Sequence, residues 1–299
     1  MNEGLGAGWR VGHWTDAQAR TGCTVLLPPR GNVCSCDIRG SSPSSRELAL
    51  LDPDRRLTEV HGVLLTGGSA FGLAAAEGVV EWLEEHGIGY ETPVALVPIV
   101  PAAVVFDLGA GDPRVRPDRD AGRSACAAAI EGPPPRGAVG AGAGATVGKW
   151  AGREHGVPGG FGFGVAEEDG ARAAAVAVVN AVGDVLADDG TVLAGTTAPP
   201  ELRKPPPDEE LPLPANTVLA LVAVEGTFEK REVRWLASRG SDGITIAVRP
   251  AHTRYDGDVV FAVAAPAPAG SPPADLDVLG PLATAAVAAA VRDAVARGR

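Results

Sequence analysis

Residues 217–224 read Thr-Val-Leu-Ala-Leu-Val-Ala-Val, an apolar run that a single hydroxyl-bearing residue, Thr217, opens. An uninterrupted apolar run of this length is typical of a strand that is buried on both faces. The preceding residues, 195–216, carry seven prolines and an acidic trio at 208–210. Because proline lacks a backbone N–H, this segment cannot enter a helix interior or a central strand, and it is predicted to be an exposed arm. The arm ends at Asn216, directly before the buried strand.

Upstream of the arm, the sequence has the order of elements found in α/β proteins. Residues 61–66 predict a buried strand that runs into the glycine turn at 67–69. A helix follows, for which Ser69 is the expected N-cap and Gly87 the expected end. A strand, a glycine turn and a helix in succession are typical of an α/β fold.

Two Asp-Gly turns, at 169–170 and 189–190, indicate antiparallel hairpins. The predicted hairpin strands are 159–165 with 173–180, and 182–187 with 191–194. Downstream of the buried strand, the expected elements are a helix over 227–239 that Gly240 ends, strands over 244–249 and 259–264, and an Ala-rich helix that Pro281 starts. No internal repeat or compositional break divides the chain, so residues 1–299 are expected to form one domain.

Composition narrows the class of protein. The 299 residues are 45% hydrophobic and 21% charged, which is typical of a globular chain. The net charge of −11, from 26 basic and 37 acidic residues, argues against nucleic acid and against an anionic membrane as partners. The apolar runs 93–106 and 282–291 are too short to span a bilayer. Four cysteines without metal-binding spacing suggest buried thiols in a reducing compartment, so a cytoplasmic protein is expected.

Cofactor and metal motifs are weak. Residues 140–145 formally fit a dinucleotide-binding fingerprint, but no strand precedes them and no helix follows, so NAD binding is not expected. The five histidines lack metal-ligand spacing. His252 with Asp256 and Asp258 could be drawn as a metal site, although a structural role for this histidine is the more common case. The sequence therefore predicts neither a metal nor an organic cofactor.

Five positions carry chemistry that remains open from the residues alone. Asp256 and Asp258 face the same way and repel each other unless a cation lies near; Lys149, isolated among apolar residues, could supply it or could be an ordinary surface lysine. Asn180 ends an apolar strand, where its amide is either a structural bridge or an oxyanion donor. Thr217 is a plain strand residue unless the bond before it breaks. Its freed α-amine, with a pKa of about 7.7–8.0, could then deprotonate its own hydroxyl.

Ten stretches match the pattern of a known family in order along the whole chain. They are residues 11–13, 21–25, 37–40, 64–76, 97–101, 106–108, 140–149, 179–184, 216–217 and 256–261. The chain resembles the DmpA-type peptidases (peptidase family S58, the P1 peptidases), and within them the NylC-type branch of 6-aminohexanoate-oligomer hydrolases, the nylon hydrolases. The glycine-serine stretch at 64–76 and the Asn-Thr junction after a proline arm are together specific to this family.

This resemblance implies an αββα sandwich similar to the N-terminal-nucleophile hydrolases, in the α/β class. It also implies self-cleavage between Asn216 and Thr217, which leaves a larger subunit, 1–216, and a smaller one, 217–299, with Thr217 as nucleophile. The other residues that match the family's site are Lys149, Asn180, Asp256 and Asp258. A homo-oligomer is implied as well, a tetramer of processed heterodimers. Two features depart from the family: aminopeptidase members usually have Ser as nucleophile, and many members have Tyr where Phe106 stands.

The predicted function is an autoprocessed N-terminal-threonine hydrolase of linear amides such as 6-aminohexanoate oligomers. The Thr217 amine would act as base, Asn180 with a backbone N–H would hold the oxyanion, and Lys149 would tune the amine and the hydroxyl. Asp256 and Asp258 would orient Lys149 or Thr217. The alternatives are an aminopeptidase of the same family, an acyltransferase resembling the ornithine acetyltransferases, and an uncleaved, non-catalytic binding relative.

Overall fold

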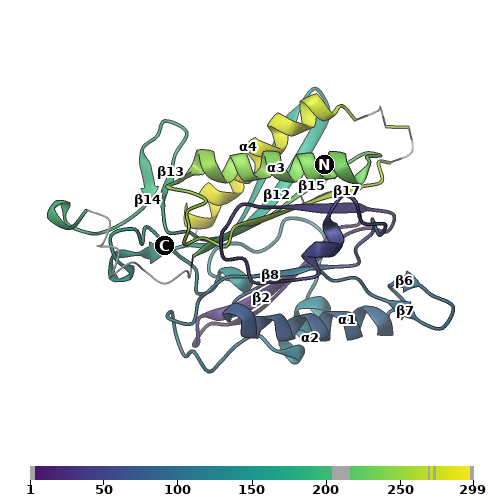
Figure 1. Ribbon diagram of the computed structural model, residues 1–299, viewed down its shortest axis with the longest axis horizontal. Helices are drawn as coiled ribbons and strands as arrows, with labels where there is room; N and C mark the ends of the chain where they lie inside the picture. Colours follow the sequence, from purple (N-terminus) through teal and green to yellow (C-terminus); the bar gives the residue numbers. More distant parts are fainter. Residues whose placement is uncertain (1–3, 204–215, 269, 272–273, 297–299) are drawn as a thin grey trace.

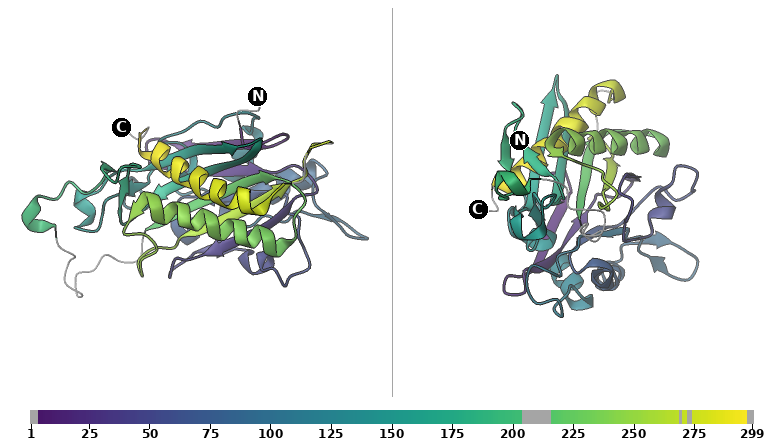
Figure 2. Two further views of the ribbon diagram at one scale, coloured as in Figure 1. Left: turned by 90° about the horizontal axis from the view of Figure 1, so that it is seen from above. Right: turned by 60° about the vertical axis from the view of Figure 1, so that its left-hand side comes forward.

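Two β-sheets stacked face to face form the middle of the molecule, and a pair of helices covers the outer face of each (Figures 1 and 2). The computed structural model describes residues 4–203, 216–268, 270–271 and 274–296. The helices are α1 (Ala75–Glu85) and α2 (Arg119–Ala127) on one sheet, and α3 (Lys230–Ala247) and α4 (Leu276–Ala296) on the other. This arrangement confirms the expected αββα sandwich.

The first five-stranded sheet lies against α1 and α2. Its strands, in spatial order, are β1 (Arg10–Asp16), β2 (Thr21–Leu27), β5 (Val63–Thr66), β8 (Ala102–Val104) and β4 (Ser45–Arg46). Only the β5–β8 pair is parallel; the others are antiparallel. A parallel neighbour requires a crossover, which the helix α1 supplies between β5 and β8.

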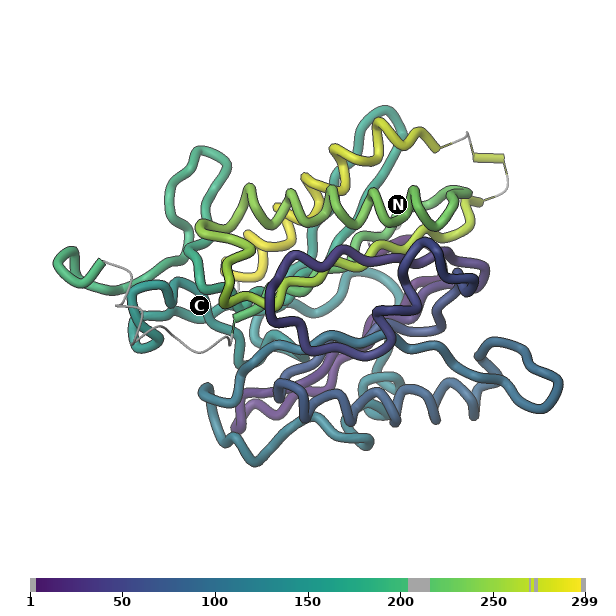
Figure 3. Tube along the Cα trace, in the orientation of Figure 1, coloured from purple at the N-terminus to yellow at the C-terminus, as the bar shows by residue number. Residues whose placement is uncertain are grey.

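The second five-stranded sheet carries the strand that follows the proline-rich arm. Its spatial order is β11 (Gly160–Glu168), β12 (Ala171–Asn180), β15 (Thr217–Glu225), β17 (Val259–Ala265) and β3 (Val33–Ile38). The strand β15 pairs antiparallel with β12 and parallel with β17, and α3 makes the crossover between β15 and β17. Figure 3 shows the purple N-terminal part of the chain beside β17, where β3 joins this sheet from a distant part of the sequence.

Short strand pairs complete the structure. They are β9 (Thr146–Val147) with β10 (Val157–Pro158), β6 (Tyr90–Glu91) with β7 (Leu96–Val97), and β13 (Asp184–Leu186) with β14 (Val192–Ala194) and β16 (Val248–Arg249). The hairpins β11–β12 and β13–β14 confirm the two antiparallel pairs that the Asp-Gly turns predict.

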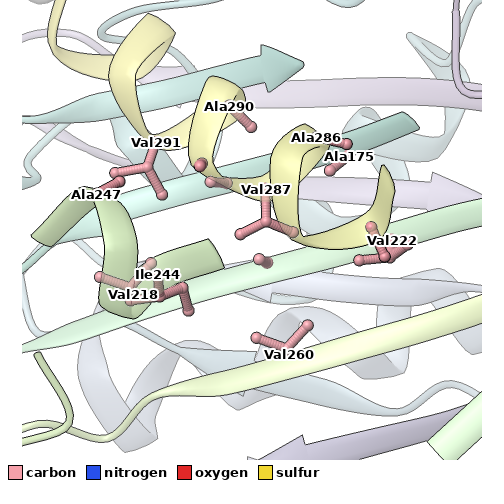
Figure 4. Packing of buried hydrophobic residues seen from close by; sticks show 14 of the residues in the cluster. Ala175, Val218, Val222, Ile244, Ala247, Val260, Ala286, Val287, Ala290 and Val291 are labelled. Carbon is pink, nitrogen blue, oxygen red and sulfur yellow. The ribbon is translucent and has the colours of Figure 1, made fainter. Parts of the chain in front are cut away.

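The strand β15 is buried on both faces, as its sequence predicts. Val218 and Val222 point toward α3 and α4 (Figure 4), whereas Leu219 and Leu221 belong to the core between the two sheets. Alternate residues of a strand point to opposite faces, so a strand with both faces covered is apolar throughout. The exceptions are the two end residues of β15, Thr217 and Glu225.

The helix α3 is longer than predicted. It runs from Lys230, after a capping box between Glu229 and Glu232, through Gly240 to Ala247. The predicted end at Gly240 and most of the predicted strand over 244–249 are therefore wrong. A Cβ at Gly240 would lie 2.8 Å from a methyl carbon of Val260, so this glycine permits close packing of the helix on the sheet instead of ending it.

The turn after β5 also differs from its prediction. Gly68 and Ser69 both have left-handed φ values, 78° and 55°, and a 3-10 helix (Ser69–Ala74) precedes α1. Ser69 makes no capping hydrogen bond, so its predicted role as N-cap is wrong. The Gly68 N–H instead donates to Asp107 Oδ1 at 2.7 Å. Asp107 is distant in the sequence and reaches this turn only in the folded chain, so the local sequence could not indicate the contact. Gly87 follows α1 with a φ of 66°, as expected of a helix end.

The closing helix α4 starts at Leu276, so Pro281 lies inside it and does not begin it. By length and composition α4 could cross a membrane. The sequence suggested otherwise, because the apolar run there covers only residues 282–291. Here 61% of its most apolar window is buried, against β11, β12 and α3. All four cysteines are free and buried. Most of the predicted arm over 195–216 lies outside the described residues.

Candidate active site

The junction between Asn216 and Thr217 lies inside the protein. Asn216 is 2% exposed and Thr217 6% exposed. Thr217 begins β15 and lies opposite Asn180 of β12 in the strand register, while Asn216 forms a bridge to Asp256 on the other side. The end of a buried strand thus places this peptide bond between two segments that carry predicted site residues.

The carbonyl oxygen of Asn216 accepts two hydrogen bonds. The Thr217 hydroxyl donates to it at 2.5 Å and the Gly257 N–H at 2.8 Å. A Cβ at Gly257 would lie 3.0 Å from Thr217 Oγ1 and 2.7 Å from the Ser42 carbonyl oxygen, so only glycine fits there without a shift. The hydroxyl is therefore held beside a carbonyl that a backbone N–H polarises, as an oxyanion donor would.

The two aspartates after the strand have different surroundings, although both are 2% exposed. Asp258 Oδ1 accepts the N–H of Val218 at 2.6 Å, and Asp258 Oδ2 lies 2.7 Å from His252 Nδ1. Asp256 Oδ2 instead accepts the backbone N–H and the hydroxyl of Thr253, at 2.8 and 2.6 Å. Burial and the nearby charge of Asp258 raise the pKa of Asp256.

His252 provides the charge that balances Asp258. Its Nε2 lies 3.1 Å from the Ser241 carbonyl oxygen. A carbonyl and a carboxylate can only accept, so both ring nitrogens donate and the imidazole is protonated. Burial lowers the pKa of His252, but the hydrogen bond and the charge of Asp258 outweigh it and raise the pKa overall. Within the described part of the chain, no cluster of His, Cys, Asp or Glu is arranged to hold a metal ion.

Lys149 is buried, at 3% exposure, which excludes the alternative of a surface lysine. Its ammonium donates to the backbone oxygen of Asn180 at 3.1 Å and to Asn180 Oδ1 at 2.9 Å. Burial, together with the positive charge of Arg153, lowers the pKa of Lys149 to about 7, while Asp256 acts in the opposite direction. This lysine can therefore gain or lose a proton near neutral pH.

Asn180 connects several segments of the site. Its Oδ1 also accepts the Thr146 N–H at 3.0 Å, and its Nδ2 donates to the Phe106 carbonyl oxygen at 3.2 Å. The structural bridge that the sequence suggested is thus present, and Gly257 supplies the N–H at the Asn216 carbonyl. The structure brings all five predicted catalytic residues to one place, around the Asn216–Thr217 bond.

Three further residues of this region are not predicted from the sequence to be catalytic. Gly257 looks like a turn glycine. The sequence groups His252 with Asp256 and Asp258 only as a possible metal site, whereas the structure makes His252 the ion-pair partner of Asp258. Arg153 lies with Lys149 and Phe106 around a cavity of about 150 Å³. No local motif marks Arg153, because the cavity forms between segments that are far apart in the sequence.

Comparison with known proteins places this geometry in context. The family model described as peptidase family S58 matches residues 7–298. An uncharacterized aminopeptidase of Mycobacterium leprae is 42% identical over 92% of this chain and 76% of its own length. A 6-aminohexanoate-oligomer endohydrolase of an Agromyces species is 30% identical over 81% of this chain and 69% of its own length.

Solved structures share the fold. A Burkholderia β-aminopeptidase superposes with a TM-score of 0.72 at 20% identity, over 98% of this chain and 86% of that one. An L-aminopeptidase D-Ala-esterase/amidase of Ochrobactrum anthropi, described as a variant of the Ntn hydrolase fold, gives 0.73 at 19% identity over the same shares. The sandwich seen here is therefore the Ntn-hydrolase-type fold of these enzymes.

Proposed function

The chain belongs to peptidase family S58 and is a peptide or amide hydrolase, and from this premise we propose that it is an autoprocessed enzyme with Thr217 as its N-terminal nucleophile. The observation that carries the proposal is the pair of hydrogen bonds on the Asn216 carbonyl, from the Thr217 hydroxyl and the Gly257 N–H. An attacking oxygen and an oxyanion donor lie at the same carbonyl.

In the self-cleavage step, Thr217 Oγ attacks the carbonyl carbon of Asn216. The C–O bond forms and the C–N bond breaks, so the chain is joined by an ester and the nitrogen of Thr217 leaves as an amine that takes up the hydroxyl proton. Water then hydrolyses the ester. The products are the Asn216 carboxylate and Thr217 with a free hydroxyl and a free α-amine.

The same oxygen then acts on the substrate. The α-amine of Thr217 removes the hydroxyl proton, and Oγ attacks the substrate amide to give an acyl-enzyme that water releases. Asn180, with a backbone N–H, holds the developing oxyanion. Lys149 lies against Asn180 and has its pKa near 7, so it tunes the protonation of the amine and the hydroxyl. The carboxylate of Asp258 accepts the N–H of Val218, and the backbone of Asp256 forms a bridge with Asn216, so the two aspartates fix the residues on either side of Thr217.

The proposed substrates are linear aliphatic amides such as 6-aminohexanoate oligomers. The likeness to 6-aminohexanoate-oligomer endohydrolases supports this class. Small residues, among them Gly109, Ala110 and Gly144, line the cavity beside Lys149, which suits a chain without side branches. The alternative is an aminopeptidase that releases an amino-terminal residue, as the names of the mycobacterial relatives suggest.

The intact mass of the purified protein tests self-cleavage. We expect two pieces, residues 1–216 and 217–299. Thr217→Ala, which lacks the attacking oxygen, is expected to remain one chain, and Thr217→Ser is expected to process at least in part. Thr227→Ala, the same substitution at an exposed position after β15, serves as control and should process normally. A wild-type chain that stays intact after long incubation at neutral pH would refute the proposal.

Product analysis tests the substrate class. The processed enzyme is incubated with linear 6-aminohexanoate tetramer, a β-alanyl amide and an α-alanyl amide, with and without an added amine acceptor. We expect cleavage of the tetramer, slower cleavage of the two amides, and no acylated acceptor. Cleavage of either short amide with the tetramer untouched would assign the chain to the aminopeptidases, and an acylated acceptor would make it an acyltransferase.

A further inference from the structure

The cavity of about 150 Å³ lies beside Asn180, the residue that is opposite Thr217 in the strand register. Three of its lining residues contact Asn180 directly: Phe106 through its carbonyl oxygen, Thr146 through its N–H and Lys149 through its ammonium. Whatever occupies this cavity therefore lies next to the strand end at which Thr217 would react.

The cavity is lined by two cations in a protein whose net charge is −11. Lys149 is buried, and Arg153 is exposed with its guanidinium carbon 5.3 Å from the centre of the Phe106 ring. No carboxylate of the described residues forms an ion pair with Arg153, and burial is the one cause that shifts its pKa, which it lowers. The guanidinium is thus held by a ring face, with its N–H groups available to a ligand.

Asp107 is the single carboxylate among the lining residues, and its two oxygens bind other parts of the protein. Its Oδ2 accepts the Thr21 hydroxyl and its Oδ1 accepts the Gly68 N–H, both at 2.7 Å. It is 4% exposed, and burial raises its pKa. Both carboxylate oxygens of Asp107 are thus engaged by protein donors, whereas the lining adds Lys149 and Arg153, so the cavity favours an anion over an ammonium group.

The volume and the lining residues of the cavity indicate the length and shape of the apolar part of the ligand. A cavity of about 150 Å³ accommodates roughly the six carbons of a benzene molecule. Gly109, Ala110 and Gly144 add no side chain beyond a methyl group to the lining. A straight aliphatic chain of about six heavy atoms fits such a space, with its polar end at Arg153.

We propose that this cavity is a subsite for the carboxylate-terminated end of the substrate, and that Arg153 is the residue that selects the carboxylate. The inference rests on the proposed amide hydrolase function and narrows its substrates to linear amides that end in a free carboxylate within about six atoms of the reacting bond. An aminopeptidase, by contrast, must accept an ammonium group beside the nucleophile, which Lys149 and Arg153 would repel.

Binding of two probes of equal length tests the subsite without any turnover. Hexanoate and hexanamide differ only in charge, and each is titrated into the purified protein and followed by ligand-observed NMR. We expect hexanoate to bind about fivefold more tightly than hexanamide, the upper range for a partly exposed ion pair. Arg153→Gln should abolish this preference and Arg153→Lys should keep part of it, since lysine retains the charge but not the planar fork.

Kinetics with a matched substrate pair extend the test. The linear 6-aminohexanoate dimer and its C-terminal carboxamide are compared in the wild type and in Arg153→Gln. The variant should raise KM for the acid about fivefold and leave KM for the amide unchanged. The control is Arg231→Gln on the exposed start of α3, where Arg231 pairs with Glu229, and it should change neither value.

The outcomes separate the subsite from the proposed function. Equal binding of hexanoate and hexanamide by the wild type, or a preference that persists in Arg153→Gln, would overturn the subsite. A preference for hexanoate in a protein that cleaves no linear amide would leave the subsite in place and overturn the proposed function. Cleavage of linear amides without any preference for a carboxylate would support the proposed function and overturn the subsite.

Discussion

Asp256 and Asp258 are two residues apart, yet the fold gives their carboxylates different partners. Asp258 faces a protonated His252 and the N–H of Val218, both of which stabilise the anion. Asp256 is buried and lies beside the charge of Asp258, so its pKa is raised to about 6, although neutral donors such as the Thr253 N–H and hydroxyl act in the opposite direction. The negative charge of Asp256 therefore forms only as the pH rises through its raised pKa.

His252→Gln tests this arrangement through the pH dependence of turnover. The substitution removes a positive charge near the carboxylates, so the pKa of Asp256, which is already raised, should rise further. If the ionised pair is needed, the acidic limb of the pH–rate profile should move to higher pH, while the rate on its plateau changes less. His86→Gln at the exposed end of α1 is the control, and its profile should match the wild type. A uniform loss at every pH, with no shift of the limb, would mean that His252 has only a structural role.

Asn180 both positions Lys149 and is the proposed oxyanion donor, and one substitution cannot separate these two roles. Its oxygen holds Lys149 and the Thr146 N–H, and its amide nitrogen is the proposed oxyanion donor. We expect Asn180→Ala to lower turnover by about 10²–10³-fold, the usual effect of losing such a donor.

Asn180→Asp keeps an acceptor for Lys149 but lacks the amide N–H, so it should be as slow as the alanine variant. Single-turnover rates on a linear amide measure both. Should the aspartate variant recover most of the activity, the role of Asn180 would be to position Lys149, and the oxyanion would depend on Gly257 instead.

At the scale of elements, glycines set the distance between α4 and the sheet. A Cβ at Gly162 in β11 would lie 2.0 Å from the carbonyl oxygen of Ala290, and one at Gly164 would lie 2.3 Å from that of Ala286. The helix backbone thus rests directly on the strand. The Ala-rich face of α4 and the glycines of β11 are two halves of one contact, which explains why a core with so few aromatic residues can be close-packed.

Gly162→Ala should therefore destabilise the protein by pushing α4 away from β11. Overpacking of this kind costs about 1–3 kcal/mol, which corresponds to a fall in Tm of roughly 2–10 °C for a chain of this size. The control is Gly62→Ala, whose Cβ would lie 3.5 Å from side-chain atoms of Leu27 and Val79, in ordinary contact. Thermal unfolding followed by circular dichroism gives both Tm values; equal values for the two variants would contradict the packing argument.

At the scale of the molecule, the proposed cleavage would not divide the protein into two bodies. The second sheet takes β11 and β12 from residues 1–216, then β15 and β17 from residues 217–299, and then β3 from the first piece again. The smaller piece is thus paired on both sides with strands of the larger one. Separation would expose the apolar strands of both pieces to water, which is strongly unfavourable.

We expect the two pieces to co-elute in size-exclusion chromatography and to separate only in denaturant. The measurement is the mass of the native species beside a denaturing gel of the same fraction. Thr217→Ala gives the matched unprocessed reference, and the two should unfold at similar denaturant concentrations if cleavage leaves the sheet intact. Release of the 217–299 piece under native conditions would show that the central pairing is weaker than its burial implies.

Much of this fold could be predicted from short stretches of the sequence. The run after the arm predicts a strand buried on both faces, and the Asp-Gly turns predict two hairpins; both predictions are confirmed, because strand burial and turn chemistry are properties of a few adjacent residues. The interpretation of Gly240 as a helix end is wrong for the opposite reason. Glycine serves there for close packing against Val260 and Val222, and a glycine needed for packing has the same sequence signature as one that ends a helix.

The sequence by itself determined the class of fold, the family and the five polar residues that the structure brings together at the Asn216–Thr217 bond. These follow from residue types and their order along the chain. Only the tertiary structure decided which groups face one another: the Gly257 N–H at the Asn216 carbonyl, the His252 imidazolium at Asp258, and Arg153 beside Lys149 in the lining of the cavity. The physical reason is that hydrogen bonds and burial depend on distances between segments that only folding brings together, and it is those distances that shift the pKa values of Lys149 and Asp256.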